Sequence, residues 1–440
     1  LSDGRMLWVG KSYQGEKEQV ELSLIRPMTA EEAAAQAAEQ SESTTMTVGG
    51  LSFLIDGMVR EAVVDFNKNN EDCQIEIVEY GAEDIQAGVV QLNADIVAGN
   101  APDVMLLPIG YSLDSYIGLG VLEDMYPYLL QDETVSMADL QENVLRAYET
   151  DGQLFGLPIS YQIVTLMGQG SLLDGRTSWT MEELMDFTAR HQANSTIFDN
   201  STQAGVLHIC LVGSGQQLID PASGALDREL MIQMLEYAKP FTPDAEYNGG
   251  MNEEQIMERA SDGRIFLFNT QVNSPHNYQM YSTLYGEPIS YVGYPGAAGS
   301  GTLVDSNMLF GINSNSELKA EAWDFISSML TEKVQDSPMM FNIPVRRSVM
   351  ETRLERAMEE NSNGLLSYGT IQMEMLPVGE KEAQMYRDLI DSVDRRADFD
   401  EQIERIIAEE SAGYFSGDRT ALEATDVIEN RVGTYLAESR

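Results

Sequence analysis

From Met46 onward the chain alternates short apolar runs with amphipathic helical patterns, and this alternation constrains the fold more than any other feature. Residues 46–54 and 75–78 have the composition of strands, while residues 59–66 and 85–96 carry apolar side chains at helical spacing. The run 104–107 is entirely apolar, as expected for a strand buried on both faces. Strands that alternate with amphipathic helices are joined by right-handed crossovers, so we predict an α/β fold with a parallel sheet.

The first 45 residues follow a different pattern. Residues 6–9 and 20–25 are strand-like runs on either side of a polar, turn-prone stretch. Thr29-Ala-Glu-Glu32 is a capping box that opens an Ala/Glu/Gln-rich stretch ending at Gln40. Because a lone hairpin is marginally stable in water, we expect this segment to dock on the main body or to be the remnant of an upstream domain.

Charge narrows the range of partners. The chain has 27 Lys and Arg against 71 Asp and Glu, a formal net charge of −44, which repels phosphate backbones and anionic lipid headgroups. We therefore expect no binding to nucleic acid or to a membrane surface. No stretch approaches the roughly 18–20 apolar residues of a membrane span. A hydrophobic content of 43% nevertheless indicates a folded chain rather than a disordered one.

Sequence patterns for catalysis and metal binding are missing. The three histidines are far apart, no calcium-loop pattern occurs, and no Gly-x-Ser-x-Gly motif is present. Gly10-Lys11-Ser12 resembles the end of a P-loop, but Arg5 stands where the first glycine of that motif is required. Asn200-Ser-Thr202 matches a glycosylation acceptor, and we interpret it as polar loop. We predict no catalytic residues, no metal site and no cofactor.

The informative polar residues lie at predicted strand ends. Tyr111 follows the buried run 104–107, Tyr161 follows a strand-like run, and Tyr294 and Asn307 lie on either side of a glycine-rich loop. In open α/β sheets ligands bind beyond the carboxyl ends of strands. Tyrosine rings can stack on the C–H faces of sugars, and amides supply both donors and acceptors. Each tyrosine could equally pack a loop with its hydroxyl in water. Both alternatives stay open, whereas Trp179 and Trp323, two of the three tryptophans, are expected in the core.

Several short motifs in a fixed order point to one family. They are Ala101-Pro-Asp-Val-Met105, Leu154-Phe-Gly-Leu-Pro-Ile-Ser-Tyr161, Ser178-Trp-Thr-Met-Glu-Glu-Leu184, Tyr291-Val-Gly-Tyr-Pro-Gly296, Lys319-Ala-Glu-Ala-Trp-Asp-Phe-Ile326 and Phe341-Asn-Ile-Pro-Val345. With this order and spacing, the chain from Met46 to Arg440, about nine-tenths of its length, resembles the extracellular solute-binding proteins of bacterial ABC importers, of the sugar-binding family 1 type. The first 45 residues fall outside the resemblance.

The resemblance implies a two-lobed type II periplasmic-binding-protein fold with a hinge. We place the hinge crossings near residues 158–165, 301–311 and 342–346. Lobe 1 would then comprise residues 46–160 and 308–343, and lobe 2 residues 163–305 and 345–440. Carried over position by position, the ligand contacts implied by the resemblance are Gly50 and Phe53 in the loop 49–53, Tyr111, Tyr161, Asn269, Tyr294, Asn307 and Asn342.

The implied function is non-enzymatic. The protein would capture a carbohydrate, and among carbohydrates an oligosaccharide, between its lobes and deliver it to an ABC transporter permease. It would be monomeric and extracellular, held at the bacterial surface by a lipid anchor in a segment absent from this chain. Three alternatives stay open: a binding protein for a peptide, polyamine or metal chelate, a glycoside hydrolase with paired carboxylates, and a surface sensing protein on the same fold.

Overall fold

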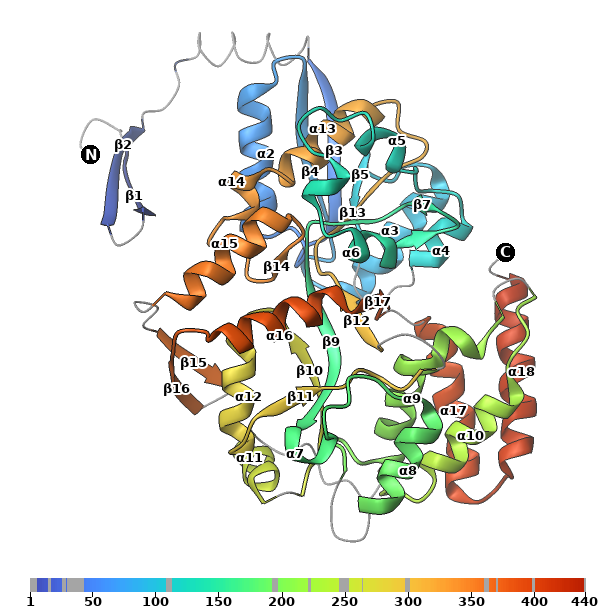
Figure 1. The fold of residues 1–440 in the computed structure, drawn as a ribbon. Helices are drawn as coiled ribbons and strands as arrows, with labels where there is room; N and C mark the ends of the chain where they lie inside the picture. The colour runs from blue at the N-terminus through green and yellow to red at the C-terminus, as the bar shows by residue number, and fades with distance from the viewer. Residues whose placement is uncertain are drawn as a thin grey trace.

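The computed structural model describes residues 6–14, 17–25, 29, 43–107, 113–191, 197–220, 223–244, 253–262, 264–296, 301–359, 364–368, 371–397 and 400–438. Two mixed β-sheets form the body of the molecule, and helices pack on both (Figure 1). We call the half built on the first sheet, the upper half in Figure 1, lobe 1. The half built on the second sheet is lobe 2.

The sheet of lobe 1 has five strands in the order β4-β3-β5-β13-β8. They are β3 (Thr44–Leu51), β4 (Cys73–Tyr80), β5 (Val104–Leu106), β8 (Leu157–Pro158) and β13 (Leu309–Ile312). The predicted alternation of strands and helices is confirmed, because α2 (Gly57–Asn69) and α3 (Ile85–Ala98) connect the three parallel strands. The parallel pairing predicted for the strands of residues 46–107 is confirmed, and the complete sheet is mixed because β13, which follows much later in the chain, joins it. β13 enters from the junction with lobe 2 and so runs antiparallel to β5.

The start of α2 shows how the sequence specifies a local element. The carboxylate of Asp56 caps the helix by accepting the backbone N–H groups of Met58 and Val59 at 2.9 and 3.0 Å. The helix buries the apolar face predicted from its spacing, including Val63 and Phe66. The remaining short elements of lobe 1 are α4 (Leu113–Gly118), α5 (Tyr126–Leu129), η1 (Met137–Asp139), α6 (Glu142–Ala147), β6 (Glu149–Thr150), β7 (Gln153–Leu154), α13 (Lys319–Met329) and α14 (Glu332–Gln335).

The sheet of lobe 2 has the order β10-β9-β12-β17, with β11 and β14 also paired to β9. Its strands are β9 (Ser160–Gln169), β10 (Leu267–Val272), β11 (Ile289–Tyr291), β12 (Thr302–Asp305), β14 (Ile343–Pro344) and β17 (Val393–Arg396). Its helices are α7 (Gly170–Leu173), α8 (Met181–His191), α9 (Gln203–Leu218), α10 (Arg228–Ala238), α11 (Glu253–Ser261), α12 (Asn277–Tyr285), α17 (Glu401–Ser416) and α18 (Ala421–Glu438). Trp179 and Trp323 are buried, as predicted, with 4% and 5% of their surface exposed.

The chain passes between the two sheets at several places. It leaves lobe 1 between Pro158 and Ser160 and returns between Asp305 and Leu309. Helices α15 (Arg347–Met358) and α16 (Glu380–Asp391), with the hairpin β15 (Gly364–Tyr368) and β16 (Ile371–Met375), lie alongside the junction (Figure 1). A lobe boundary at residue 345 stays our proposal, since buried side chains of α15 and α16 belong to the core cluster of lobe 1.

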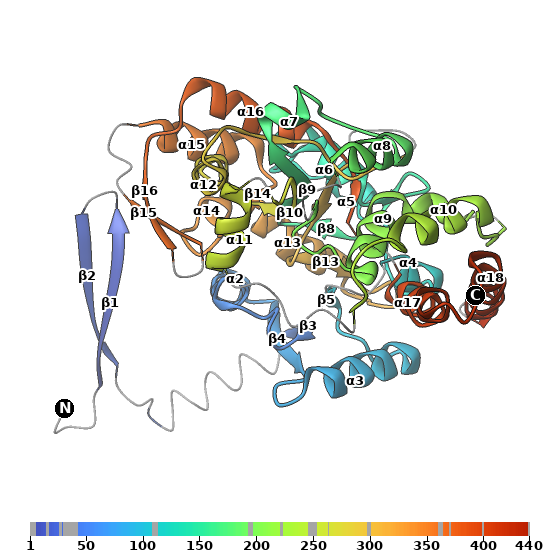
Figure 2. The same cartoon turned by 90° about the horizontal axis from the view of Figure 1, so that it is seen from below.

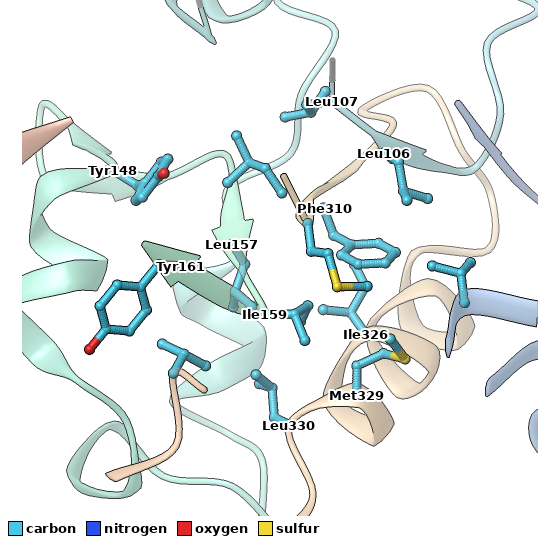
Figure 3. Packing of buried hydrophobic residues seen from close by; sticks show 14 of the residues in the cluster. Leu106, Leu107, Tyr148, Leu157, Ile159, Tyr161, Phe310, Ile326, Met329 and Leu330 are labelled. Carbon is cyan, nitrogen blue, oxygen red and sulfur yellow. The ribbon is translucent and has the colours of Figure 1, made fainter. Parts of the chain in front are cut away.

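The hydrophobic core continues across this junction. Six side chains from strands of lobe 2 belong to the core cluster of lobe 1: Tyr161, Ile163, Val272, Val304, Ile343 and Val393. Figure 3 shows the part of this cluster where Leu157, Ile159 and Tyr161 follow one another through the crossing. A second cluster fills lobe 2 between its sheet and α8, α9, α10, α17 and α18. The lobes are therefore joined by packed side chains as well as by the chain itself.

The N-terminal hairpin is separate from this body. Strands β1 (Met6–Gln14) and β2 (Lys17–Ile25) pair antiparallel, which confirms the two strand-like runs in the sequence. The hairpin stands apart from the two lobes in both views (Figures 1 and 2). The predicted capping box and spacer, residues 29–40, lie almost wholly outside the described residues.

A close contact between two glycines closes the turn from β4 into α3. Gly81 has a positive φ of 72°, and a Cβ added to Gly88 would lie 2.4 Å from the Cα of Gly81. We expect Gly88→Ala to lower the free energy of unfolding by about 2 kcal/mol, because backbone would have to move. Gly433→Ala in α18 is the control. Its new Cβ meets open space, so urea unfolding should show a gain of up to about 1 kcal/mol. Equal small effects of both changes would contradict the close approach.

Candidate functional site

A hollow of about 720 Å³ lies in lobe 2 between α9, α17 and β10. Its volume is within the usual range of small-molecule sites. Its lining residues are Asp199, Asn200, Gln203, Ala204, Gly205, Leu207, His208, Ile209, Leu211, Pro243, Asp244, Asn269, Glu404, Ala408, Ala412, Phe415 and Ser416. Strand β10 leads from the hollow toward the junction, since its last residue, Val272, pairs with Ile163 just after the crossing. One of the predicted contact residues, Asn269, lines this hollow.

A buried tyrosine orients the side chain of Asn269. Tyr294 is 1% exposed, and its hydroxyl donates to Oδ1 of Asn269 at 2.5 Å. With Oδ1 engaged in this way, Nδ2 is the donor that Asn269 can offer to a molecule in the hollow. Tyr294 therefore supports the site from behind. The structure brings these two predicted residues together, but only Asn269 lines the hollow.

Asp199 supplies a carboxylate beside Asn269. Its Oδ1 accepts the backbone N–H of Asn269 at 3.4 Å. Burial of this carboxylate raises its pKa from 3.8 to about 6, although backbone N–H groups of Asn269 and Asn200 act in the opposite direction. A desolvated carboxylate at the wall of a hollow is a candidate for ligand contact, because such groups concentrate at functional sites.

An ion pair connects the two helices that flank the hollow. Nδ1 of His208 on α9 lies 2.5 Å from Oε1 of Glu404 on α17. The hydrogen bond to Glu404 raises the pKa of His208, while burial opposes that shift. The pair fixes the spacing of α9 and α17 on one side of the hollow.

A second set of predicted residues meets at the lobe junction. Asn342 Nδ2 donates to Asn307 Oδ1 at 2.9 Å, although the two residues are 35 positions apart. Gln162 Nε2 donates to Asp305 Oδ2 at 3.1 Å in the adjoining strands. Polar side chains therefore lie where the chain crosses between the lobes.

Two exposed aromatic rings lie in the segments next to these amides. Phe341 precedes Asn342 and is 84% exposed, while Phe53 follows β3 and is 50% exposed. The two segments approach each other, because a Cβ on Gly57 would lie 3.6 Å from the side chain of Met339. Exposed rings beside amides are groups that suit a ligand with both polar and apolar faces.

Two predicted contacts lie elsewhere, and a third is not among the described residues. Tyr161 is fully buried in the core that joins the lobes, so no ligand reaches it in this conformation, and its role there is packing (Figure 3). Gly50 is buried, and a Cβ there would lie 2.9 Å from the backbone oxygen of Leu106. It permits close contact between β3 and β5 and offers no side chain to a ligand. Tyr111 lies outside the described residues.

Sequence reasoning missed Asp199, Gln203, His208 and Glu404. The only local signal was the polar run at Asn200-Ser-Thr202, which we interpreted as loop. Thr202 is in fact the N-cap of α9, and its Oγ1 accepts the N–H of Gly205 at 3.0 Å. A polar pair immediately before a helix N-cap was the feature that could have indicated this position.

A larger hollow, about 1440 Å³, lies on lobe 1 between α2, α13, α14 and α15. Its two basic side chains are already paired, Lys333 with Asp65 at 2.9 Å and Arg356 with Asp336 at 2.7 Å. None of the predicted contact residues that the structure describes lines it. We therefore place the candidate site at the smaller hollow, where an oriented amide and a desolvated carboxylate converge.

Two other kinds of site are absent from the described part of the chain. No group of three or more His, Cys, Asp or Glu residues in the described ranges is arranged to hold a metal ion. Among the helices that the structure describes, none has the length and apolar character needed to cross a membrane.

Comparison with known proteins identifies the family. The family model described as bacterial extracellular solute-binding protein matches residues 61–355, about two-thirds of the chain. The chain belongs to the bacterial extracellular solute-binding protein family. Its members are non-catalytic receptors of ABC transporters, so the chain is a solute-binding protein rather than an enzyme.

Solved structures of other solute-binding proteins share the fold. An extracellular solute-binding protein family 1 member from Alicyclobacillus acidocaldarius is 15% identical, with a TM-score of 0.58, over 90% of this chain and 98% of that one. The sugar-binding protein MalE from Xanthomonas citri is 17% identical, with a TM-score of 0.57, over 90% and 98%. The cyclic alpha-maltosyl-1,6-maltose binding protein from Arthrobacter globiformis is 15% identical, with a TM-score of 0.54, over 89% and 98%. This solute-binding protein therefore has the type II periplasmic-binding-protein fold predicted from its sequence.

Proposed function

We propose that this solute-binding protein captures a carbohydrate, and specifically an oligosaccharide, and delivers it to the permease of an ABC importer. The observation that carries the proposal is the hollow in lobe 2, whose lining brings the amide of Asn269 and the carboxylate of Asp199 together among apolar side chains. A donor next to an acceptor matches neighbouring hydroxyls on a sugar ring, and apolar walls match its C–H faces.

The residues at the lobe junction extend this proposal to a longer ligand. Asn307 and Asn342 present amides, and the exposed rings of Phe53 and Phe341 lie in the adjoining segments. A ligand that contacts both lobes stabilises the arrangement in which they lie closer together, so binding would shift an open–closed equilibrium. The relatives named above as sugar-binding and maltosyl-maltose-binding support the same class of ligand.

A ligand screen tests the proposal directly. Titration calorimetry and thermal shift against mono- and oligosaccharides should give saturable binding to at least one oligosaccharide. Small-angle scattering should then show a smaller radius of gyration with that ligand present. If all glycans fail while a peptide, a polyamine such as spermidine or a metal chelate binds saturably, the carbohydrate proposal is wrong and the corresponding alternative takes its place.

Removing either junction amide should weaken binding without unfolding the protein. We expect Asn307→Ala and Asn342→Ala each to lower glycan affinity about 3- to 10-fold, the equivalent of one or two lost hydrogen bonds. Asn307 is exposed and Asn342 half-buried, so melting temperatures should change little. Asn100→Ala, an exposed change before β5 at the opposite end of that strand from the junction, is the control. Equal affinities for all three variants would remove the junction from the binding site.

A further inference from the structure

The carboxylates around the lobe 2 hollow differ in how far the protein compensates their charge, and this difference bears on the charge of the ligand. Three carboxylates line it, Asp199, Asp244 and Glu404, and no described lining residue is Lys or Arg. Two of the three are compensated by the protein. Asp244 Oδ2 accepts the N–H of Ala204 at 3.1 Å in the first turn of α9, where the helix dipole is positive. Glu404 is paired with His208 at 2.5 Å.

Among the described residues, Asp199 has neither a charged partner nor a hydrogen bond from the first turn of a helix. Its hydrogen bonds come from neutral backbone N–H groups, the one from Asn269 being 3.4 Å long. Within the described part of the chain, no Lys, Arg or His forms an ion pair with it. The carbonyl oxygen of Lys239 accepts from the lining residue Gln203, but its ammonium is engaged elsewhere, because it donates to the carbonyl oxygens of Tyr414 and Phe415 at 2.5 and 2.7 Å. An uncompensated carboxylate in a partly desolvated position is costly, and a cation supplied by the ligand would remove that cost.

The residues around Asp199 indicate which kind of cation would fit there. The apolar part of the lining includes Leu207, Leu211 and Phe415. Asn269 belongs to the same lining, and because its Oδ1 accepts from Tyr294, its Nδ2 is left as a donor. A compact metal ion would find one carboxylate and mostly apolar neighbours, which is a poor set of ligands. A ring with an amine next to a hydroxyl fits better. The amine would donate to Asp199 while the hydroxyl oxygen accepts from Asn269.

We propose that the ligand carries a protonated amine that pairs with Asp199, so that an amino-sugar glycan binds in preference to its neutral counterpart. This inference rests on the proposed function and refines its substrate class. A charge-assisted hydrogen bond is about twice as strong as a neutral one, so the preference should be about tenfold in affinity.

Three trisaccharides with the same β-1,4 backbone make the test. Chitotriose carries an amine at C2, cellotriose a hydroxyl, and triacetylchitotriose an uncharged amide. Glucosamine against glucose repeats the comparison without any linkage. Titration calorimetry at pH 7 should rank each amine form about tenfold above its hydroxyl and acetyl counterparts. Asp199→Asn should abolish that ranking, whereas Asp72→Asn, an exposed carboxylate in the turn before β4, should leave it intact.

The other possible results overturn the amine proposal, the assignment to Asp199 or the proposed function, and they can be told apart. If amine and hydroxyl forms bind equally, or if only neutral glycans from the wider screen bind, the amine proposal is overturned while carbohydrate binding stands. If the preference survives in Asp199→Asn, the assignment to this carboxylate is overturned. If no glycan binds at all, the proposed function fails and the amino-sugar inference fails with it. Spermidine binding in that last case would show that the hollow recognises amines without sugar.

Discussion

Replacing Tyr161 with alanine is expected to lower the free energy of unfolding by about 3–5 kcal/mol, the usual cost of emptying a large aromatic site in a core. Tyr161 is 0% exposed and belongs to the cluster that joins the two lobes. Urea unfolding of purified variants measures the loss. Ligand affinity at a temperature where the variant remains folded should change little. A large loss of affinity with a small loss of stability would instead show that Tyr161 contacts the ligand, as the sequence had suggested.

Tyr161→Phe is the control that separates ring from hydroxyl. Among the described residues the buried hydroxyl has no hydrogen-bond partner, and burial raises its pKa well above 10. Removing an unsatisfied buried hydroxyl while keeping the ring costs nothing in packing, so the variant should be as stable as the parent or more stable by about 1 kcal/mol. A loss of 1 kcal/mol or more would reveal a hydrogen bond that this conformation lacks.

Asp199→Asn should have opposite effects on stability and on binding. The folded protein holds this carboxylate with a pKa of about 6, above its ordinary value of 3.8. Such a group is stabilising only when protonated, so its favourable contribution is complete below about pH 4 and is lost as the pH rises through 6. The isosteric amide carries no charge at any of these pH values. We expect the variant to be more stable by about 1–3 kcal/mol at pH 7.5, because the pKa of Asp199 in the folded protein lies about two units above its ordinary value.

The pH dependence of that gain is the decisive measurement. Paired unfolding curves of parent and variant at pH 7.5 and pH 4 should show the gain at the higher pH only, and affinity for an amine-bearing glycan should fall in the variant at pH 7.5. The other titratable groups that line the hollow, His208, Glu404 and Asp244, and the buried Tyr294 behind Asn269 are the same in both proteins, so the difference isolates Asp199. Asp72→Asn should be neutral at both values. An equal gain at both pH values would mean that charge burial is not its cause.

Much of the fold could be predicted because the pattern of apolar residues reflects burial directly. The spacing of Val59, Val63 and Phe66 indicated the face of α2 that the structure buries, and the all-apolar run 104–107 indicated a buried central strand. The order of short motifs then indicated the family. The direction of β13 could not be read in this way. It depends on which end of lobe 1 the chain re-enters after some 150 residues in lobe 2.

The candidate site was predicted less completely, for a physical reason. Position at a strand end indicates that a side chain is near an edge of the sheet, but not what covers it. Tyr161 follows such an end, yet β14 pairs beside it and the lobe junction closes over it. The opposite is true of Asp199, which lines the candidate site but was not predicted. Its importance comes from α9, α17 and β10 enclosing one carboxylate, and these elements are up to about 200 residues apart in sequence. Among the predicted residues that the structure describes, the pairs joined by a hydrogen bond are Tyr294 with Asn269 and Asn342 with Asn307.

The shared core at the junction has a consequence for how the molecule comes apart. Side chains from β9, β10, β12, β14 and β17 pack in the same cluster as those of the lobe 1 sheet. Neither lobe can lose its structure without exposing apolar surface that belongs to the other, so the two should melt as one cooperative unit. A ligand that contacts one lobe then stabilises the whole body against unfolding. The lobe that the ligand does not contact is stabilised to the same degree.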